Sequence, residues 1–312
     1  MSFSQNAKAE LSRVFPPSIQ GLICELCGII YYAGDNGQIE DGFSIAVGSA
    51  AIARKAYTMV KKLVDLTVTI MVRNKIRLQQ GRTYIVAVER QPGYDRLLDF
   101  LPASEEALAE VITAGGPSEM AAFLRGSFLA CGSITNPEKN YHLEMVCQRQ
   151  GQAEMLVQAA KACNVDFRVS HRKGVPVVYV KEGEQIVHFL NMAGANNALL
   201  TLENIRVWKE LRNQVNRRVN CETANMDKTV KAAMEQIRAI KVLADTIGLS
   251  KLPKSLQGVA RLRLDYPYAS LKELGTLLDP PISKSAVNHR MRRIEKLAKE
   301  LTNTKGAEGL DT

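Results

Sequence analysis

A nine-residue pattern that occurs twice limits the folds open to this chain. The segments "LCGIIYYAG" at residues 26–34 and "LRGSFLACG" at residues 124–132 both fit L-x-G-x-x-x-x-x-G. A glycine within an apolar helical stretch costs up to about 1 kcal/mol relative to alanine, so the matching glycines need a common reason. The two segments begin 98 residues apart, and a pattern that recurs at this separation indicates a duplicated unit.

The elements expected after the two copies follow in the same order. Alternating apolar residues indicate strands, and apolar residues three and four apart indicate helices. After the first copy we expect a strand pair within 37–48, a helix at 51–64, strands at 66–74 and 82–89, and a helix at 94–101. After the second copy we expect strands at 132–135 and 141–148, a helix at 152–164, strands at 166–171 and 175–181, and a helix at 184–194. Each unit is helix, two strands, helix, two strands, helix, which predicts an α+β domain of two repeats.

The repeated glycines predict a contact between the two repeated helices. Gly28 and Gly126 occupy equivalent positions, and Gly34 and Gly132 stand where the helices end. Equivalent helices can pack about a pseudo-two-fold axis, and glycine lets their backbones approach closely. We therefore predict that these four glycines serve the packing of the helix pair. The alternative is that they are unrelated, one of them being a C-terminal cap.

The charge of the chain is unevenly distributed. The net charge is +9, and residues 206–312 contain 21 Lys and Arg against 12 Asp and Glu, so residues 1–205 are electrically neutral. This asymmetry favours a polyanion-binding module joined to a neutral one. A basic, merely solvated helix surface is the alternative.

Cysteine use and hydropathy predict a cytoplasmic protein without a metal. The chain has no apolar run long enough to span a membrane, and "MSFSQNAKAELSRVF" lacks the apolar core of a secretory signal. Its six cysteines are scattered, as is typical of reduced thiols. Cys24 and Cys27 form a C-x-x-C, but they lie in an apolar helix without a second ligand pair, so we interpret them as core residues.

The C-terminal segment carries the signals of a helix-turn-helix. In "YASLKELGTLLDPPISKSAVNHRMRRIEKLAKEL", Ser270 and Glu273 form a capping box, "DPPIS" interrupts the helix, and Ser283 caps a second one. The apolar residues of that second helix are Val287, Met291, Ile294 and Leu297. Upstream, we expect linker helices at 201–248, starting near Thr201 and broken at 220–225, with Asn225 or Asp227 capping the second of them.

The second helix presents residues suited to DNA. Side chains near its start normally read base edges, and basic residues further along neutralise phosphates. The predicted DNA-binding residues are Ser283, Lys284, Ser285, Asn288, His289, Arg290, Arg292, Arg293 and Lys296. An ordinary basic amphipathic helix is the alternative.

The double unit resembles the LAGLIDADG homing-endonuclease fold, and nearly the whole chain resembles the WhiA family of bacterial sporulation and cell-division regulators. The more specific parts of the resemblance are "FLRGSFLACGSI", "NRRVNCETANMDKTV" and the helix-turn-helix. It implies a first LAGLIDADG-like repeat with its N-terminal segment at 1–115, a second at 116–200, the linker at 201–248 and the helix-turn-helix domain at 249–312.

The nuclease family places a metal-binding acid just before the final glycine of each motif. Those positions are Ala33 and Cys131 here, and the other acidic position of the motif corresponds to Tyr31 and Leu129. Alanine offers no ligand, and a thiol is too soft for Mg²⁺, so we expect no catalytic residues, no metal and no cofactor. Whether the sheets contact DNA stays open: Arg73 with Lys75, and Arg168 with Arg172, share strand faces, but Glu89, Glu144 and the neutral charge favour a protein-binding scaffold.

The sequence as a whole predicts a non-enzymatic, sequence-specific DNA-binding transcriptional regulator. The resemblance implies action on promoter DNA in sporulation, cell division or chromosome segregation, at the nucleoid and together with another transcription factor or RNA polymerase. A metal-dependent LAGLIDADG endonuclease, or a protein-interaction module with a non-specific basic tail, are the alternatives.

Overall fold

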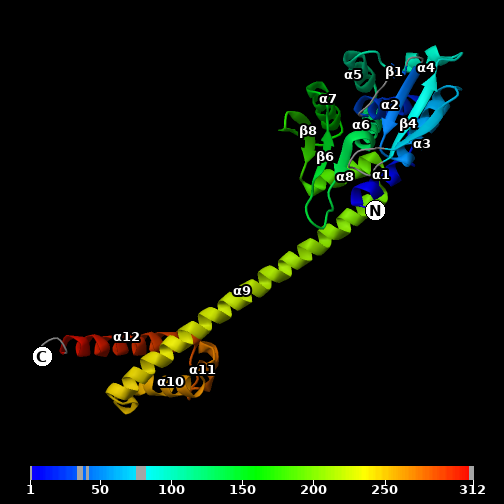
Figure 1. The fold of residues 1–312 in the computed structure, drawn as a ribbon. Coiled ribbons are helices and arrows are strands. Elements are labelled where there is room, and N and C mark those ends of the chain that lie inside the picture. The colour runs from blue at the N-terminus through cyan, green and yellow to red at the C-terminus, as the bar shows by residue number, and fades with distance from the viewer. Residues whose placement is uncertain (1, 34–37, 40–41, 75–81, 309–312) are drawn as a thin grey trace. The chain divides into compact units, whose positions relative to one another are not determined.

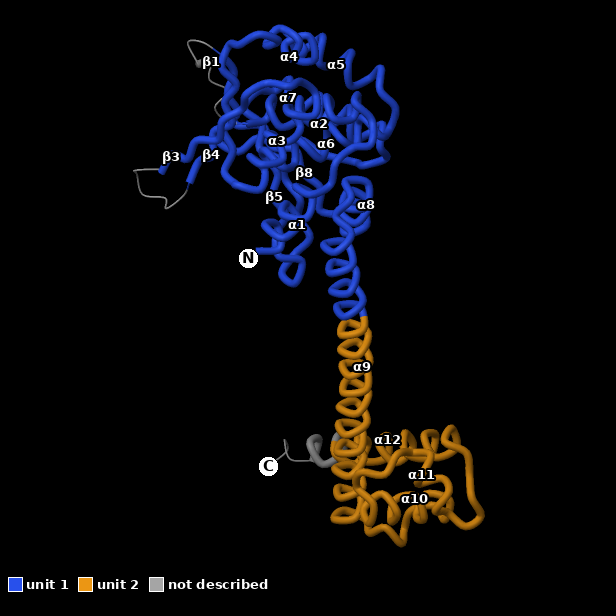
Figure 2. The backbone as a smooth tube through the Cα atoms, turned by 90° about the vertical axis from the view of Figure 1, so that its right-hand side faces the viewer, with its two compact units in different colours: residues 1–210 blue, residues 211–312 orange. Residues whose placement is uncertain are grey.

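The structure is a computed structural model that describes residues 2–33, 38–39, 42–74 and 82–308 (Figure 1). The chain divides into two compact units, residues 1–210 and residues 211–312 (Figure 2). Gly34, predicted for helix packing, and Lys75, predicted on a strand face, lie outside the described residues.

Unit 1 begins with a helix that the sequence reading did not anticipate, followed by the first repeat. Ser2 caps this helix through its side chain. A second unexpected helix, capped by Ser104, follows the repeat. The elements are α1 (Phe3–Leu11), α2 (Ile19–Tyr32), β1 (Gln38–Ile39), β2 (Gly42–Val47), α3 (Ala50–Leu63), β3 (Thr69–Asn74), β4 (Arg82–Glu89), α4 (Tyr94–Phe100) and α5 (Glu105–Ala114).

The second repeat has the same order of elements, as predicted. They are α6 (Pro117–Cys131), β5 (Gly132–Ile134), β6 (Leu143–Val146), α7 (Gln150–Ala162), β7 (Arg168–Arg172), β8 (Val175–Val180) and α8 (Gly183–Ala193). Among the described residues each repeat forms an antiparallel four-stranded sheet, in the orders β1-β2-β4-β3 and β5-β6-β8-β7. The identical strand order confirms the duplicated α+β architecture.

The helix pair α2 and α6 lies at the centre of the unit 1 core, and ten of the 14 residues of α2 are buried. A Cβ atom on Gly28 would overlap the Phe123 carbonyl oxygen and lie 2.9 Å from Ser127 N. These two residues stand three before and one after Gly126. A Cβ atom on Gly126 would in turn overlap the Glu25 carbonyl oxygen and lie 3.1 Å from Ile29 N, three before and one after Gly28. The contact is therefore reciprocal, and backbone touches backbone at both glycines.

Gly132 has a different surrounding from the two central glycines. It follows the end of α6, and a Cβ atom there would collide with the ring and carbonyl oxygen of Phe128 in its own helix. Gly132 therefore lets the chain leave α6 beside Phe128, and it does not touch α2 in the way that Gly126 does.

A charged cluster is buried beside the helix crossing. Glu25 on α2 accepts two hydrogen bonds from the Arg125 guanidinium on α6, at 2.9 and 2.7 Å, and pairs with Lys55 on α3. Lys55 also donates to the backbone carbonyls of Leu11 and Val14. A carboxylate stays ionised in a protein core only when it is paired with a cation and hydrogen-bonded. Glu25 meets both conditions through Arg125 and Lys55. The cluster connects α2, α3 and α6 with the end of α1 and the segment after it.

Unit 2 contains the end of a long helix, a 3₁₀ turn at Leu249–Lys251 and the helices α10 (Lys254–Asp265), α11 (Leu271–Leu277) and α12 (Lys284–Glu308). Its core is separate from that of unit 1. The buried residues of this core are Ile240, Leu243, Leu252, Leu256, Val259, Ala260, Leu274, Val287, Met291, Ile294 and Ala298.

The long helix corrects the prediction of two linker helices. α9 runs without a break from Asn196 to Thr246, so the expected interruption at 220–225 is wrong, and so is a start at Thr201. Asn225 and Asp227 are interior residues rather than caps. The segment "NCETAN" contains poor helix formers but neither glycine nor proline, and each such residue costs at most about 0.7 kcal/mol relative to alanine.

Candidate nucleic-acid interface

The helices α11 and α12 form the predicted helix-turn-helix, and Gly275 makes its turn tight. Ile282 N donates to the Gly275 carbonyl oxygen at 2.9 Å. A Cβ atom on Gly275 would overlap the Ile282 carbonyl oxygen and lie 3.3 Å from the Val287 side chain. Glycine therefore allows the start of α12 to lie directly against α11.

Both helices are capped at the positions that the sequence predicts. Glu273 N donates to Ser270 Oγ at 3.2 Å, and Ser270 N donates to Glu273 Oε2 at 2.7 Å, which completes the capping box. The hydrogen bond from Ser270 N, together with the Ser270 side chain, lowers the pKa of the Glu273 carboxyl. Ser283 Oγ accepts from Ala286 N at 3.2 Å and so caps α12. The caps fix where α12 begins.

Arg263 of α10 supports the helix-turn-helix from inside and was missed by the sequence reading. Its side chain is buried, and Nη1 donates to the carbonyl oxygens of Ala269, at 2.6 Å, and Pro267, at 3.3 Å. These bonds hold the loop that leads into α11. The available signal was its spacing: Arg263 follows Leu256 and Val259 by seven and four residues, which is a core position of the helix.

The predicted DNA-binding residues of α12 divide between its outer face and its flanks. Val287, Met291 and Ile294 face the core. Opposite them lies one exposed row of side chains with helical spacing, and Arg293 lies beside it. We call this row the outer row; it consists of Ser285, His289, Arg292 and Lys296.

The other predicted residues are placed differently. Lys284 is exposed in the first turn, whereas Asn288 and Arg290 are half-buried on opposite flanks of α12. Lys296 lies 3.8 Å from Glu300, at the long end of ion-pair contact. Lys299 is also exposed and lies seven residues after Arg292, so it extends the basic surface beyond the predicted set.

The positions where a LAGLIDADG nuclease would hold its metal carry no carboxylate in unit 1. Ala33 ends α2 and is buried. Cys131 ends α6, its Sγ donates to the Ser127 carbonyl oxygen at 3.3 Å, and burial raises its pKa. From α1, Lys8 Nζ donates to the Leu129 carbonyl oxygen at 3.0 Å. An ammonium thus lies at the end of α6, and no cluster of three or more His, Cys, Asp or Glu occurs among the described residues.

Three family models match successive parts of the chain. They are the WhiA N-terminal LAGLIDADG-like domain at residues 22–101, the WhiA LAGLIDADG-like domain at 120–212 and the WhiA C-terminal HTH domain at 215–298. A curated relative from Desulforamulus reducens, "Probable cell division protein WhiA", is 46% identical over 99% of this chain and 99% of its own. The chain belongs to the WhiA family.

Further relatives agree with this assignment to the WhiA family. The "Probable cell division protein WhiA" of Clostridium novyi is 42% identical over 96% of this chain and 98% of its own. The crystal structure of full-length DUF199/WhiA from Thermatoga maritima matches with a TM-score of 0.59 and 28% identity, covering 96% of this chain and 99% of that one.

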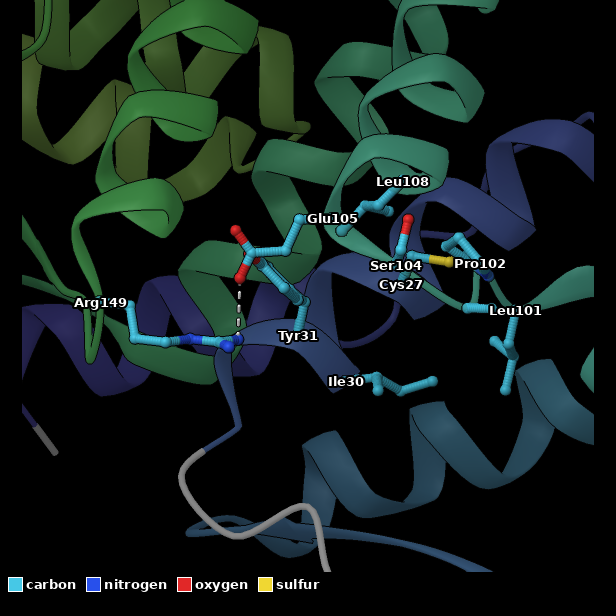
Figure 3. A pocket seen from close by; sticks show the side chains of 10 residues that line it. Cys27, Ile30, Tyr31, Leu101, Pro102, Ser104, Glu105, Leu108 and Arg149 are labelled. Atoms are coloured by element: carbon cyan, nitrogen blue, oxygen red, sulfur yellow. Dashed lines mark ion pairs between the residues drawn. The ribbon is translucent and has the colours of Figure 1, made fainter.

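A cavity of about 340 Å³ lies beside the last turns of α2 in this WhiA chain (Figure 3). Its apolar wall includes Ile30 and Leu108, and its polar end is formed by Glu105, Arg149 and Tyr31. The Arg149 guanidinium lies 3.2 Å from the Glu105 carboxylate and 5.6 Å from the centre of the Tyr31 ring. Its lining contains one carboxylate, which already pairs with an arginine, and this is a poor ligand set for a divalent metal.

The two predicted strand arginines of the second sheet, Arg168 and Arg172, are paired with acids in this WhiA chain. Arg168 Nη2 lies 3.0 Å from Glu182, and Arg172 Nη1 lies 2.8 Å from Glu144. His142 also lies 3.0 Å from Glu144. Arg73 is exposed on β3. Phosphate binding needs positive charge that is not already paired with acids. The strands of the second sheet carry little such charge.

The C-x-x-C pair lies in the core, as the sequence predicts. Cys24 and Cys27 are buried free thiols, and burial raises their pKa values to about 11 and 12. Within the described ranges, no helix combines the length and apolar character needed to cross a membrane.

Proposed function

We propose that this chain is a transcriptional regulator that reads specific DNA sequences with α12, does not cleave DNA, and acts in cell division, sporulation or chromosome segregation. The names of its relatives support the cell-division role. On this proposal the chain works at the nucleoid in the cytoplasm, on promoter DNA and together with another transcription factor or RNA polymerase.

The outer row of α12 is the observation that carries the proposal. Recognition helices place their N-terminal residues against base edges in the major groove. Ser285 and His289 stand in the first two turns of α12, where they can donate to or accept from base edges. Arg292 and Lys296 stand further along, where cations meet phosphates. The polar groups and charges follow one exposed line, which suits a helix lying in a groove.

The state of unit 1 supports a regulator rather than a nuclease. Hydrolysis of DNA by a metal site needs carboxylate ligands at the ends of the paired helices, and those positions hold Ala33 and Cys131. The ion-paired arginines of the second sheet support a scaffold role for unit 1 in place of a DNA saddle. Incubation of the chain with plasmid and Mg²⁺ or Mn²⁺ should leave the plasmid intact, and cleavage would contradict the proposal.

A binding experiment with the full chain tests the assignment to α12. Bound sequences are selected from random duplexes, and affinities are measured across a salt series. The double variant R292A/K296A should weaken binding to all sequences and reduce the slope of log K against log salt by about 2. S285A and H289A should instead change the preferred base at particular positions, each with a loss of about 1–3 kcal/mol.

A matched control removes the same charge elsewhere in unit 2. Lys228 and Lys231 are exposed on α9, so K228A/K231A lowers the net charge by the same amount as R292A/K296A. We expect the control to keep the selected sequence and most of the affinity. If both double variants lost binding equally, the basic tail would act non-specifically and the proposed sequence reading by α12 would be wrong.

A further inference from the structure

The middle of α9 is exposed on every side within unit 2. All residues from 211 to 232 are exposed, including five large apolar side chains that are 39–68% accessible. They are Leu211, Val215, Val219, Met226 and Val230. An isolated helix of about 20 residues is only marginally stable in water, and most helices are stabilised by packing of an apolar face. A contiguous apolar row without cover therefore indicates an interaction surface.

The apolar residues form a straight row with an 11-residue period. Val215 and Met226 are 11 residues apart, as are Val219 and Val230, and as are Leu211 and Glu222. Eleven residues make three turns of an α-helix almost without drift, so the row stays on one side. We call this row the α9 seam; it consists of Leu211, Val215, Val219, Glu222, Met226 and Val230.

The seam has the same spacing in both directions. Its successive steps are four, four, three, four and four residues, which is symmetric about the bond between Asn220 and Cys221. A two-fold axis at that bond would bring the seam onto an identical seam running the opposite way. Leu211 would then oppose Val230 of the second copy, and Val215 would oppose its Met226.

Glu222 selects between the two directions of such a pair. In a parallel pair, two Glu222 carboxylates would meet in one layer, and like charges at that position repel. In an antiparallel pair, Glu222 opposes Val219 of the second copy and comes beside its Arg218. Arg218 Nε already donates to Glu222 Oε1 at 3.0 Å within α9, so the cation lies at the edge of the seam.

We infer that the seam is a homodimer interface, in which two α9 helices pair antiparallel about the bond between residues 220 and 221. The inference rests on residues of α9 alone and does not depend on the proposed DNA binding. It extends over about 20 residues per helix, or roughly 30 Å, and two of its six layers contain a Glu222 carboxylate, so it belongs among small interfaces. We expect a dissociation constant of the order of 10 μM.

The test is sedimentation equilibrium of the full chain from about 1 to 200 μM, a range that brackets the expected affinity. The wild type should pass from monomer to dimer across this range. V215E and M226K should each remain monomeric over it, because each places a charge against an apolar partner. An equal mixture of V215E and M226K should dimerise again, since the carboxylate introduced in one chain then opposes the ammonium introduced in the other.

The mixture distinguishes the direction of the pair, and matched controls test the face. In a parallel pair, V215E and M226K would not meet, so failure of the mixture to dimerise would overturn the antiparallel arrangement. N213E and A224K introduce the same charges, also 11 residues apart, on the opposite side of α9, and should dimerise like the wild type. At about 1 μM, where the wild type is also monomeric, circular dichroism should show equal helix content in all variants, because every substituted side chain is exposed. A wild type that stays monomeric throughout would overturn the inference and leave the seam to a different protein.

Discussion

Replacing Gly126 with alanine should destabilise unit 1, because the added methyl group meets the backbone of α2. The new Cβ atom would overlap the Glu25 carbonyl oxygen and lie 3.0 Å from its carbonyl carbon. Both are backbone atoms of α2 and cannot rotate away, so the helices must separate by about 1 Å. A gap of that size removes a quarter to a half of the dispersion energy of each atom pair it widens.

The size of the effect follows from three contributions. If about 40 atom pairs of the helix contact each lose roughly 0.05 kcal/mol, the packing loss is about 2 kcal/mol. Lengthening the 2.7 and 2.9 Å hydrogen bonds between Arg125 and Glu25 adds a similar cost, because both groups are buried. Alanine returns about 1 kcal/mol of helix propensity. The net loss is about 3 kcal/mol, or about 6–12 °C in Tm for a unit of this size.

Thermal unfolding by calorimetry or circular dichroism measures this loss. G28A should also be destabilised, since its Cβ would meet the backbone of Phe123 and Ser127. G48A is the matched control, because an added Cβ there meets nothing within 4 Å, and it should melt within about 2 °C of the wild type. If G126A melted together with G48A, the reasoning that the glycines are required by backbone contact would be refuted.

Three further predictions concern buried charges. E25Q should lower the free energy of unfolding by about 3–5 kcal/mol in urea titrations, because it leaves Lys55 and Arg125 without their buried counter-charge; a loss below about 1 kcal/mol would show that the cluster is solvated. R263K should destabilise unit 2 by about 1–3 kcal/mol, since one ammonium cannot replace the guanidinium that holds the loop before α11; unchanged melting of the helix-turn-helix would contradict this. Burial lowers the pKa of Lys8 to about 8, below its unfolded value of 10.5, so the unfolded chain binds the extra proton between these values and Lys8 favours folding more as pH rises. The stability of wild type relative to K8M should therefore increase by about 1–2 kcal/mol from about pH 7.5 to 10, and a flat difference would show that Lys8 is not desolvated.

The repeat architecture could be predicted because both copies carry the same local signals. Alternating apolar residues predicted the strands. Gly28 and Gly126 predicted which two helices meet, because a residue with a Cβ atom would keep the two backbones apart. The helix-turn-helix was predictable for a similar reason: Ser270 with Glu273, and Ser283, are caps that act within four residues. Because these caps involve only neighbouring residues, they can be recognised from the sequence without knowing the rest of the fold.

Long-range arrangements could not be predicted in this way. The partners of Glu25 lie 30 and 100 residues away, and nothing in the local sequence pairs them. The ion pairs of Arg168 and Arg172 depend on strand register, so the strand pattern alone could not show that these arginines are neutralised. The continuity of α9 was not predicted, because the poor helix formers at 220–225 were interpreted as a break. Without glycine or proline, these residues do not end a helix. The helix α5 was signalled by Ser104 and two following acids, and it was overlooked rather than unpredictable.

The buried pair of Glu25 and Arg125 has a consequence for how the two halves of unit 1 recognise each other. The reciprocal glycine contact offers the same surface to both halves, so by shape alone either half, produced as a separate fragment, could associate with a copy of itself. Two first halves would leave each Glu25 carboxylate with Lys55 but without Arg125, and two second halves would bury two Arg125 guanidiniums without Glu25. Only the mixed pair joins a carboxylate to a guanidinium across the crossing. Two fragments made by dividing the chain between α5 and α6 should therefore bind each other in preference to copies of themselves. The difference would come from the Glu25–Arg125 ion pair, because the shape of the glycine contact is the same in all three pairings.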